Sequence, residues 1–215
     1  MLTCTECSNI PCLTTGRNED MKTCPCMSHT VEEMMAYYDQ DDIKTTYNAA
    51  LVESEGYAVQ TRVEEIMDFA YKMGYKHLGL AFCVGFIREA KTFVKILRSN
   101  GFKVEAVSCK NCGVPKELIG IGHDHYVNKK RDAEAMCNPV GQAKLLNAEK
   151  VDLSVVLGLC VGHDTLFLKY IETPVTMLAV KDRAMGNNPL GAIYTADGYM
   201  KRQYNFIERK YSENK

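Results

Sequence analysis

The stretch HLGLAFCVGFIREAKTFVKILRSNGFKVEAVS, residues 77–108, decides the fold class. It contains two short runs with the length of β-strands, His77–Phe82 and Lys103–Ser108. Between them, Phe86–Arg98 repeats apolar residues every three or four positions, which is the pattern of an amphipathic helix that lies on a sheet. A strand, a helix and a second strand in this order predict a right-handed βαβ unit, and therefore a parallel sheet.

The same alternation continues downstream. A helix is expected from CNPVGQAKLLN (137–147), a strand over Asp152–Leu157, a helix over about Asp164–Ile171 and a strand over Val175–Val180. The later run GAIYT (191–195) is a possible fifth strand. We therefore expect an α/β fold, with a three-layer, Rossmann-like parallel sheet of about four to five strands.

The chain before residue 76 is expected to be helical, with a cysteine-rich start. Ser28 is the predicted N-cap of a first helix, and further helices are expected over Ile43–Glu55 and Arg62–Met73, the last one ended by Gly74. Five cysteines stand among few large apolar groups at the start, so this segment cannot fold by burial alone. The predicted organisation is a cysteine-rich metal-binding head over residues 1–27, a helical segment packed on the main domain over 28–75, and an α/β domain over 76–215.

Composition narrows the function classes. With 215 residues, 46% hydrophobic and 25% charged, the chain is an ordinary globular protein, and its net charge of −1 gives no reason to expect nucleic acid or a membrane as partner. No apolar run reaches the roughly 18 residues of a membrane span, and the N-terminus lacks a signal-peptide pattern. We expect a cytoplasmic protein, and the sequence makes no prediction of its oligomeric state.

The chain has ten cysteines. In a reducing compartment such cysteines bind metal or react more often than they form disulfides. Ligands of open parallel sheets bind outside the carboxyl ends of the strands, so cysteines that follow strands are expected to converge at one rim. The alternative is that they are small buried core residues. The candidate cofactor-binding residues at this rim are Cys83, Cys109, Cys112, Cys137 and Cys160.

Thiolate ligation favours an iron–sulfur cluster or Zn²⁺, and the sequence leaves that choice open. The head has the spacing C-x2-C-x4-C-x11-C-x-C, in which the first pair is a usual metal half-site. A bound metal would supply the folding energy that this segment lacks. The alternative is a redox-active tail without metal. The candidate metal ligands of the head are Cys4, Cys7, Cys12, Cys24 and Cys26.

A thiol enzyme is a further possibility, with Cys160 as nucleophile and His163 near the position of its base, because residues three apart at a helix start can face one another. His123 and His125 form a short pair suited to metal or proton transfer, although loop residues are the commoner interpretation. Lys181 and Arg183 follow the last strand and would offset thiolate or anionic-ligand charge at the rim, although solvated loop cations are the commoner interpretation. Motifs for dinucleotides, nucleoside triphosphates and serine hydrolases are absent from the sequence.

The segments FCVGFIREA, CKNCG, MCNPVGQAKLLN, GLCVGHDTLF and VKDRAMGNNP together resemble the prokaryotic family catalogued as domain of unknown function 1847, over nearly the whole chain. The resemblance implies a cysteine-rich metal site on an α/β domain, in anaerobic bacteria and archaea, with no established reaction. By position it matches Cys4, Cys7, Cys12 and Cys24 in the head and Cys83, Cys109, Cys137 and Cys160 at the rim. Cys26 and Cys112 are less tied to the pattern.

The leading hypothesis is a cysteine-ligated iron–sulfur protein that transfers electrons or performs redox chemistry on a small ligand at the rim. Its partner would be that small molecule or a redox protein. The alternatives are a non-catalytic zinc-binding or metal-handling module and the thiol enzyme that uses Cys160. Whether the protein is an enzyme stays undecided at this level.

Overall fold

The computed structural model describes residues 3–14, 16–19 and 21–211, and these fall into two compact units. The division comes after Glu55, so the second unit starts at Gly56. The helix α3 (Arg62–Met73) therefore belongs with the sheet. The predicted domain boundaries at 27 and 75 stay predictions, and their outer ends, residues 1–2 and 212–215, lie outside the described residues.

The first unit consists of short turns and two helices. The turns are 3-10 helices at Cys4–Glu6, Pro11–Thr14 and Pro25–Met27, and the helices are α1 (Val31–Met35) and α2 (Gln40–Gly56), of which only the last residue falls in the second unit.

The N-cap of α1 is Thr30, so the prediction of Ser28 was wrong. The Thr30 hydroxyl accepts the Glu33 N–H at 3.1 Å, and the Glu33 carboxylate accepts the Thr30 N–H at 2.8 Å, which completes a capping box. Ser28 instead ends the preceding turn, where its N–H donates to the Pro25 carbonyl. Of Ser28 and Thr30, only Thr30 is followed three residues later by the glutamate that a capping box requires.

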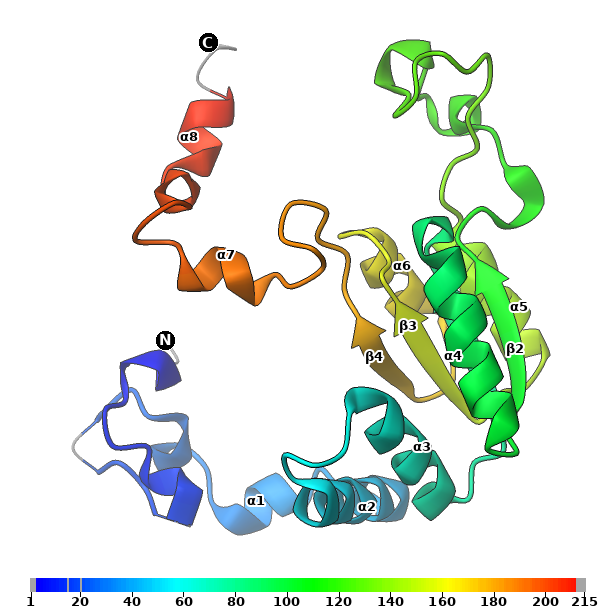
Figure 1. The fold of residues 1–215 in the computed structure, drawn as a ribbon. Helices are drawn as coiled ribbons and strands as arrows, with labels where there is room; N and C mark the ends of the chain where they lie inside the picture. The colour runs from blue at the N-terminus through cyan, green and yellow to red at the C-terminus, as the bar shows by residue number, and fades with distance from the viewer. Residues whose placement is uncertain (1–2, 15, 20, 212–215) are drawn as a thin grey trace. The chain divides into compact units, whose positions relative to one another are not determined.

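The second unit is built on a four-stranded parallel sheet in the order β2-β1-β3-β4 (Figure 1). Each strand is short and, in β1 and β3, almost wholly buried, as expected where helices cover both faces. This confirms the α/β class. The strands are β1 (His77–Phe82), β2 (Lys103–Ser108), β3 (Leu153–Leu157) and β4 (Val175–Ala179).

The possible fifth strand at 191–195 was wrong, because Leu190–Tyr194 forms helix α7. Pro189 precedes it with φ −63° and ψ −23°, a helical conformation that the proline ring favours at a helix start. Further turns lead to a 3-10 turn at Lys201–Gln203 and to α8 (Phe206–Tyr211). In the part of the chain that the structure describes, no helix has the length and apolarity needed to cross a membrane.

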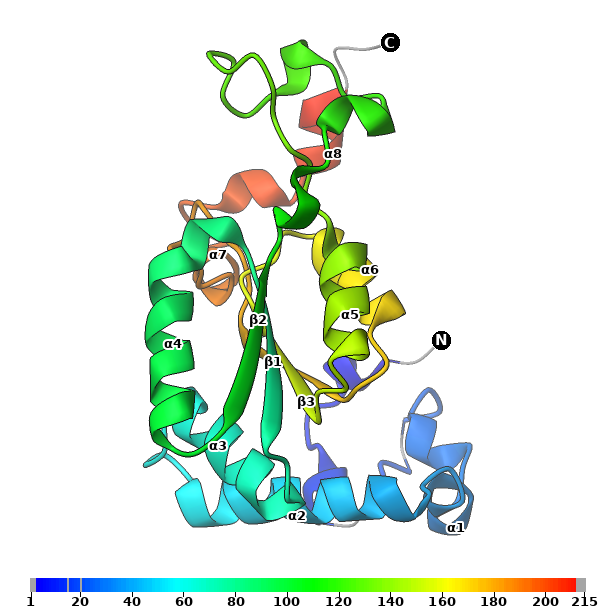
Figure 2. The same cartoon turned by 90° about the vertical axis from the view of Figure 1, so that its right-hand side faces the viewer.

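Helices cover both faces of the sheet (Figure 2). Helix α4 (Ile87–Ser99) lies on one face and buries Phe93 and Leu97. Helices α5 (Pro139–Ala148) and α6 (His163–Tyr170) lie on the other face and bury Leu146 and Phe167, both fully inaccessible. The core is therefore the sheet between these two helical layers.

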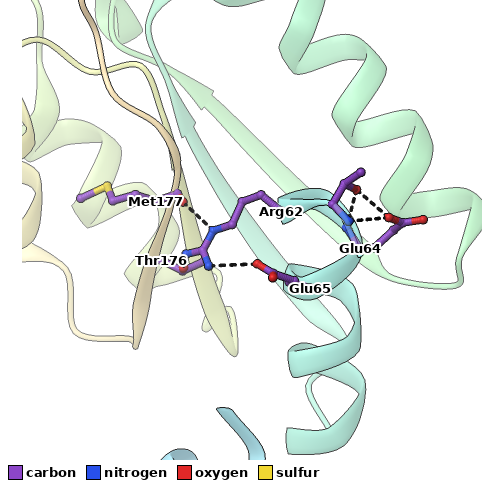
Figure 3. A network of polar contacts seen from close by, with 6 residues as sticks. Arg62, Glu64, Glu65, Thr176 and Met177 are labelled. Atoms are coloured by element: carbon purple, nitrogen blue, oxygen red, sulfur yellow. Dashed lines mark hydrogen bonds and ion pairs between the residues drawn. The ribbon is translucent and has the colours of Figure 1, made fainter. Parts of the chain in front are cut away.

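Helix α3 closes the β4 edge of the unit. A Thr61–Glu64 capping box starts it, and Gly74, at φ +80°, ends it as predicted. Arg62 donates from Nε to the Met177 carbonyl at 3.2 Å and from Nη2 to the Thr176 hydroxyl at 2.7 Å (Figure 3). Because β4 is an edge strand, Arg62 satisfies a carbonyl that would otherwise be available for pairing with another chain.

Candidate metal centre

The strand order places a switch point between β1 and β3. After β1 the chain passes to α4 on one face, and after β3 it passes to α6 on the opposite face. Cys83 follows β1 directly, and Cys160 comes shortly after β3. Crevices of this kind, outside the carboxyl ends of diverging neighbours, are where open α/β sheets bind ligands.

A cavity of about 510 Å³ lies at this rim and has Cys83, Cys109, Cys137 and Cys160 in its lining. The structure thus brings together four of the five predicted rim cysteines, from the three connections that follow β1, β2 and β3. Cys112 is exposed and does not line the cavity, and its φ of +61° sets it on a separate turn. The ligand roles of all five stay predictions.

The repeated Cys-Val-Gly letters do not form a repeated structure. Cys83 continues the sheet ladder, since its N–H donates to the Leu157 carbonyl at 3.0 Å, and Gly85 lies in a 3-10 turn. Cys160 instead follows a left-handed turn at Gly158 (φ +64°), and Gly162 (φ +86°) caps α6. The two loops reach the same rim by different backbone routes.

Cys109 lies at the centre of a group of three thiols. Its sulfur is 3.9 Å from the Cys137 sulfur and accepts the Val84 N–H at 3.3 Å. Hydrogen bonds with Cys109 lower the pKa of Cys83 to about 5 and the pKa of Cys137 to about 6. The same contacts raise the pKa of Cys109 itself, so without metal the group holds two thiolates around one thiol.

Cations surround this group. The positive charge of Lys181 lowers the pKa of Cys83 further. Electrostatic interaction with Lys110 and His163 does the same for the pKa of Cys137. The opposing effect at each thiol is burial, which disfavours the charged form. At Cys83 and Cys137 the Cys109 hydrogen bonds, helped by these positive charges, outweigh the effect of burial on the pKa.

Cys160 has a different partner. The Arg183 guanidinium donates to its sulfur at 3.2 Å, and this contact raises the pKa of Arg183. His163 also lines the cavity, and its backbone N–H donates to the Cys160 carbonyl at 2.9 Å. Both residues predicted for a thiol enzyme are thus at the rim, whereas His123 and His125 are exposed and outside the cavity lining.

Two asparagines that the sequence analysis missed hold the ends of the rim loop, residues 110–136. The Asn111 amide donates to the carbonyls of Ser108 and Asn138, and the Asn138 amide donates back to Asn111 at 2.9 Å. Asn138 also caps α5 by accepting the Gly141 N–H. An asparagine before a proline at a helix start is an N-cap signature, so Asn138 was detectable from the sequence.

Gln142 links the carboxyl ends of β1 and β2. It is fully buried on α5, and its amide nitrogen donates to the carbonyls of Phe82 at 3.2 Å and Val107 at 2.7 Å. Phe82 immediately precedes Cys83, and Val107 lies two residues before Cys109. The side chain thereby ties together the two strands whose ends hold the central thiols.

A buried ion pair stiffens the rim loop. Lys116 Nζ lies 2.5 Å from the Glu134 carboxylate, which also accepts the Asn128 N–H at 3.1 Å. The side chains are only 13% and 7% exposed. The hydrogen bond from Lys116, followed by the one from the Asn128 N–H, lowers the pKa of Glu134.

We expect the rim loop to lose protection in acid. A lowered folded pKa means that the pair contributes stability above the ordinary glutamate value of about 4.3, and that this is lost as pH falls through the folded value. Glu134→Gln removes the charge at every pH. Hydrogen exchange of residues 116–135 should therefore be faster in the variant at pH 7, and the difference should shrink below pH about 4. Equal exchange at pH 7 would refute this role.

The head forms a second thiol cluster within the first unit. All five of its cysteines line a small cavity of about 50 Å³. The Asn18 amide donates to the Cys7 sulfur at 3.3 Å and lowers the pKa of Cys7, with the Ile10 and Asn9 N–H groups adding to the effect. N–H donors of this kind surround metal-bound thiolates.

Crowding acts in the other direction at Cys26. Its hydrogen bond with Cys24 raises the pKa of Cys26, and the nearby Cys12 and Cys4 raise it further. Neighbouring thiols disfavour the charged form of Cys26, and a bound cation would favour its thiolate. The donor chemistry of the head fits a thiolate-bound metal.

The rim gives a geometric test of fit. Two ligands of one tetrahedral zinc, each at about 2.3 Å, are about 3.8 Å apart, and the sulfurs of Cys109 and Cys137 are 3.9 Å apart. Over residues 3–14, 16–19 and 21–211, no three His, Cys, Asp or Glu side chains are already arranged as ligands of one ion. The donor set thus fits a metal, with one pair of thiols at ligand separation.

Comparison with known proteins gives a family and one relative. The family model described as "Protein of unknown function (DUF1847)" matches residues 23–178, which include all the rim cysteines. "Uncharacterized protein MJ0455" of Methanocaldococcus jannaschii is 41% identical over 193 residues, covering 89% of this chain and 93% of the relative. No solved structure matches.

Proposed function

We propose that this chain, which belongs to the DUF1847 family, is a cysteine-ligated iron–sulfur protein of the cytoplasm. Its rim cysteines, Cys83, Cys109, Cys137 and Cys160, would hold the cluster, and the head cysteines would hold a second cluster or a zinc ion. The protein would transfer electrons, or perform redox chemistry on a small ligand in the rim cavity. Its partner would be that ligand or a redox protein.

The observation that supports this best is the convergence of four thiols, from the connections after three neighbouring strands, on one cavity at the switch point of the sheet. Chance burial of cysteines does not explain two thiols whose pKa values lie at about 5 and about 6. Thiolates are the form that binds iron and zinc. The cavity volume of about 510 Å³ leaves room for a group larger than one ion and for a ligand beside it.

Polar groups around the sulfurs suit a cluster. A bound cluster would supply one-electron transfer. The Val84 N–H contacts the Cys109 sulfur, Arg183 contacts the Cys160 sulfur, and Lys181 lies near Cys83. Hydrogen bonds and positive charge at the sulfurs stabilise the more negative, reduced state and so raise the reduction potential.

Zinc is the second candidate for the rim. The separation of 3.9 Å between the sulfurs of Cys109 and Cys137 favours it, because it is close to that of two ligands on one tetrahedral ion. In that case the protein would be a metal-handling module without redox chemistry.

Metal and acid-labile sulfide content, with a visible spectrum, of protein purified without oxygen tests the proposal. We expect iron and sulfide in near-equal amounts and absorption near about 400 nm, which is lost on mild oxidation. Zinc alone would favour the second candidate. A colourless protein with neither metal would contradict both.

A further inference from the structure

The wall of the rim cavity beyond the thiols is strongly cationic. Among the described residues that line it, the only carboxylate is Glu134. Lys116 neutralises that carboxylate at 2.5 Å. The remaining basic side chains of the wall are Lys110, Arg131, His163, Lys181 and Arg183.

Most of these cations already have a partner. Lys110 donates to the Ala135 carbonyl at 2.5 Å, Lys181 lies 3.7 Å from the centre of the Phe86 ring, and Arg183 donates to Cys160. The Arg131 side chain, in contrast, makes no ion pair or hydrogen bond with any residue in the described ranges, although it lines the cavity. A guanidinium on a cavity wall with none of its donors used is suited to a bound oxyanion.

The total charge of the wall also favours an anion. The cavity lining contains one carboxylate, Glu134, against five Lys and Arg side chains, Lys110, Lys116, Arg131, Lys181 and Arg183. A cavity lined by one sign of charge attracts ligands of the opposite sign. The wall therefore retains excess positive charge after its internal pairs are formed.

The same cavity has an apolar side. The rim loop contributes Ile119, Ile121, Val127 and Met136, and Val84 follows β1. Pockets for small organic molecules combine such surfaces with a few polar groups that fix orientation. An inorganic ion alone would leave these side chains unused.

We infer that the rim cavity binds a small organic oxyanion, a carboxylate or a phosphate ester, whose anionic group contacts Arg131 and whose apolar part lies against the rim loop. This names the class of ligand for the redox site and rests on the proposed function. A carboxylate and a phosphate each present two oxygens that can accept paired hydrogen bonds from one guanidinium. The two probes of the test, malonate and inorganic phosphate, distinguish a carboxylate ligand from a phosphate ligand.

The test is isothermal titration of anaerobically purified full-length protein with inorganic phosphate and, separately, malonate. Arg131→Gln is compared with Lys130→Gln, a charge-matched change at the neighbouring residue, which is exposed like Arg131 but does not line the cavity. We expect Arg131→Gln to weaken binding of at least one probe about tenfold or more, and Lys130→Gln less than about twofold. Arg131→Lys, which keeps the charge but loses the forked geometry, should fall between them.

Metal content of each variant separates the two proposals. Binding that depends on Arg131 supports the inference, whether phosphate or malonate is the tighter probe. Such binding to protein that holds neither iron nor zinc would retain the anion site and refute the metal function. Metal-loaded protein that binds neither probe below about 10 mM, or equal weakening in both glutamine variants, would overturn the inference alone.

Discussion

Cys109→Ser is expected to strip the metal from the rim and leave the head loaded. Cys109 is 2% exposed and contacts both neighbouring sulfurs of its group, so no other side chain is placed to replace it. A serine hydroxyl is a hard, neutral donor that soft metals bind poorly. Metal bound at the rim should fall to less than about a tenth, because even the loss of a residue that only supports a ligand costs 10- to 100-fold in affinity.

The measurement is iron, sulfide and zinc per chain, with a visible spectrum, on protein prepared without oxygen. Cys112→Ser is the matched control, because Cys112 lies three residues away, is exposed and stands outside the cavity lining. It should keep full metal content. Cys7→Ser should show the reverse pattern, with loss from the head only. Retention of all metal by Cys109→Ser would refute the rim site.

The parts of the fold that were predicted correctly are those set by local patterns. The strands His77–Phe82 and Lys103–Ser108 and the helix Arg62–Met73 have the predicted bounds. Each is a run of one periodicity ended by a residue with a clear preference, as Gly74 shows with its φ of +80°. Where local preference and tertiary structure agree, the sequence is sufficient to predict the bounds of a helix or strand.

The site needed information that no local pattern carries. Convergence of the rim cysteines depends on β1 and β3 being neighbours, and strand order follows from packing of the whole sheet. The side-chain contacts of Gln142 and Asn111 join segments 27 to 60 residues apart. The helix at Leu190–Tyr194 was read as a strand because a five-residue apolar run fits either state.

Burial alone does not decide between ligand and core residue. Cys83 and Cys109 are both members of the hydrophobic core, as the alternative interpretation expected. The features that distinguish them from inert core thiols are the N–H donor at Cys109, the lysine near Cys83 and the shared cavity. The pKa distinguishes only Cys83, where it is lowered to about 5, because the pKa of Cys109 is raised, as in an inert buried cysteine.

Gly158→Ala is expected to cause the largest loss of stability among single changes at the rim. An added Cβ would lie 1.9 Å from the Phe86 ring, and φ is +64°, which disfavours any side chain. The Gly158 N–H also donates to the Ala179 carbonyl at 2.7 Å, so the backbone cannot move away without breaking the sheet end. Strain and overpacking together should lower the free energy of unfolding by about 3 kcal/mol.

Gly120→Ala separates the two causes. Its φ of +76° imposes the same backbone penalty, but no atom lies within 4 Å of an added Cβ, so we expect a loss of about 1 kcal/mol. Urea unfolding of the metal-free proteins measures both, because a bound metal would add its own stabilisation. The Lys181 ammonium lies 3.7 Å from the centre of the Phe86 ring, and Phe86 lies three residues after Cys83. Displacement of the Phe86 ring should therefore also weaken metal binding at the rim. Equal destabilisation by the two alanines would show that the Phe86 ring does not hold the rim in place.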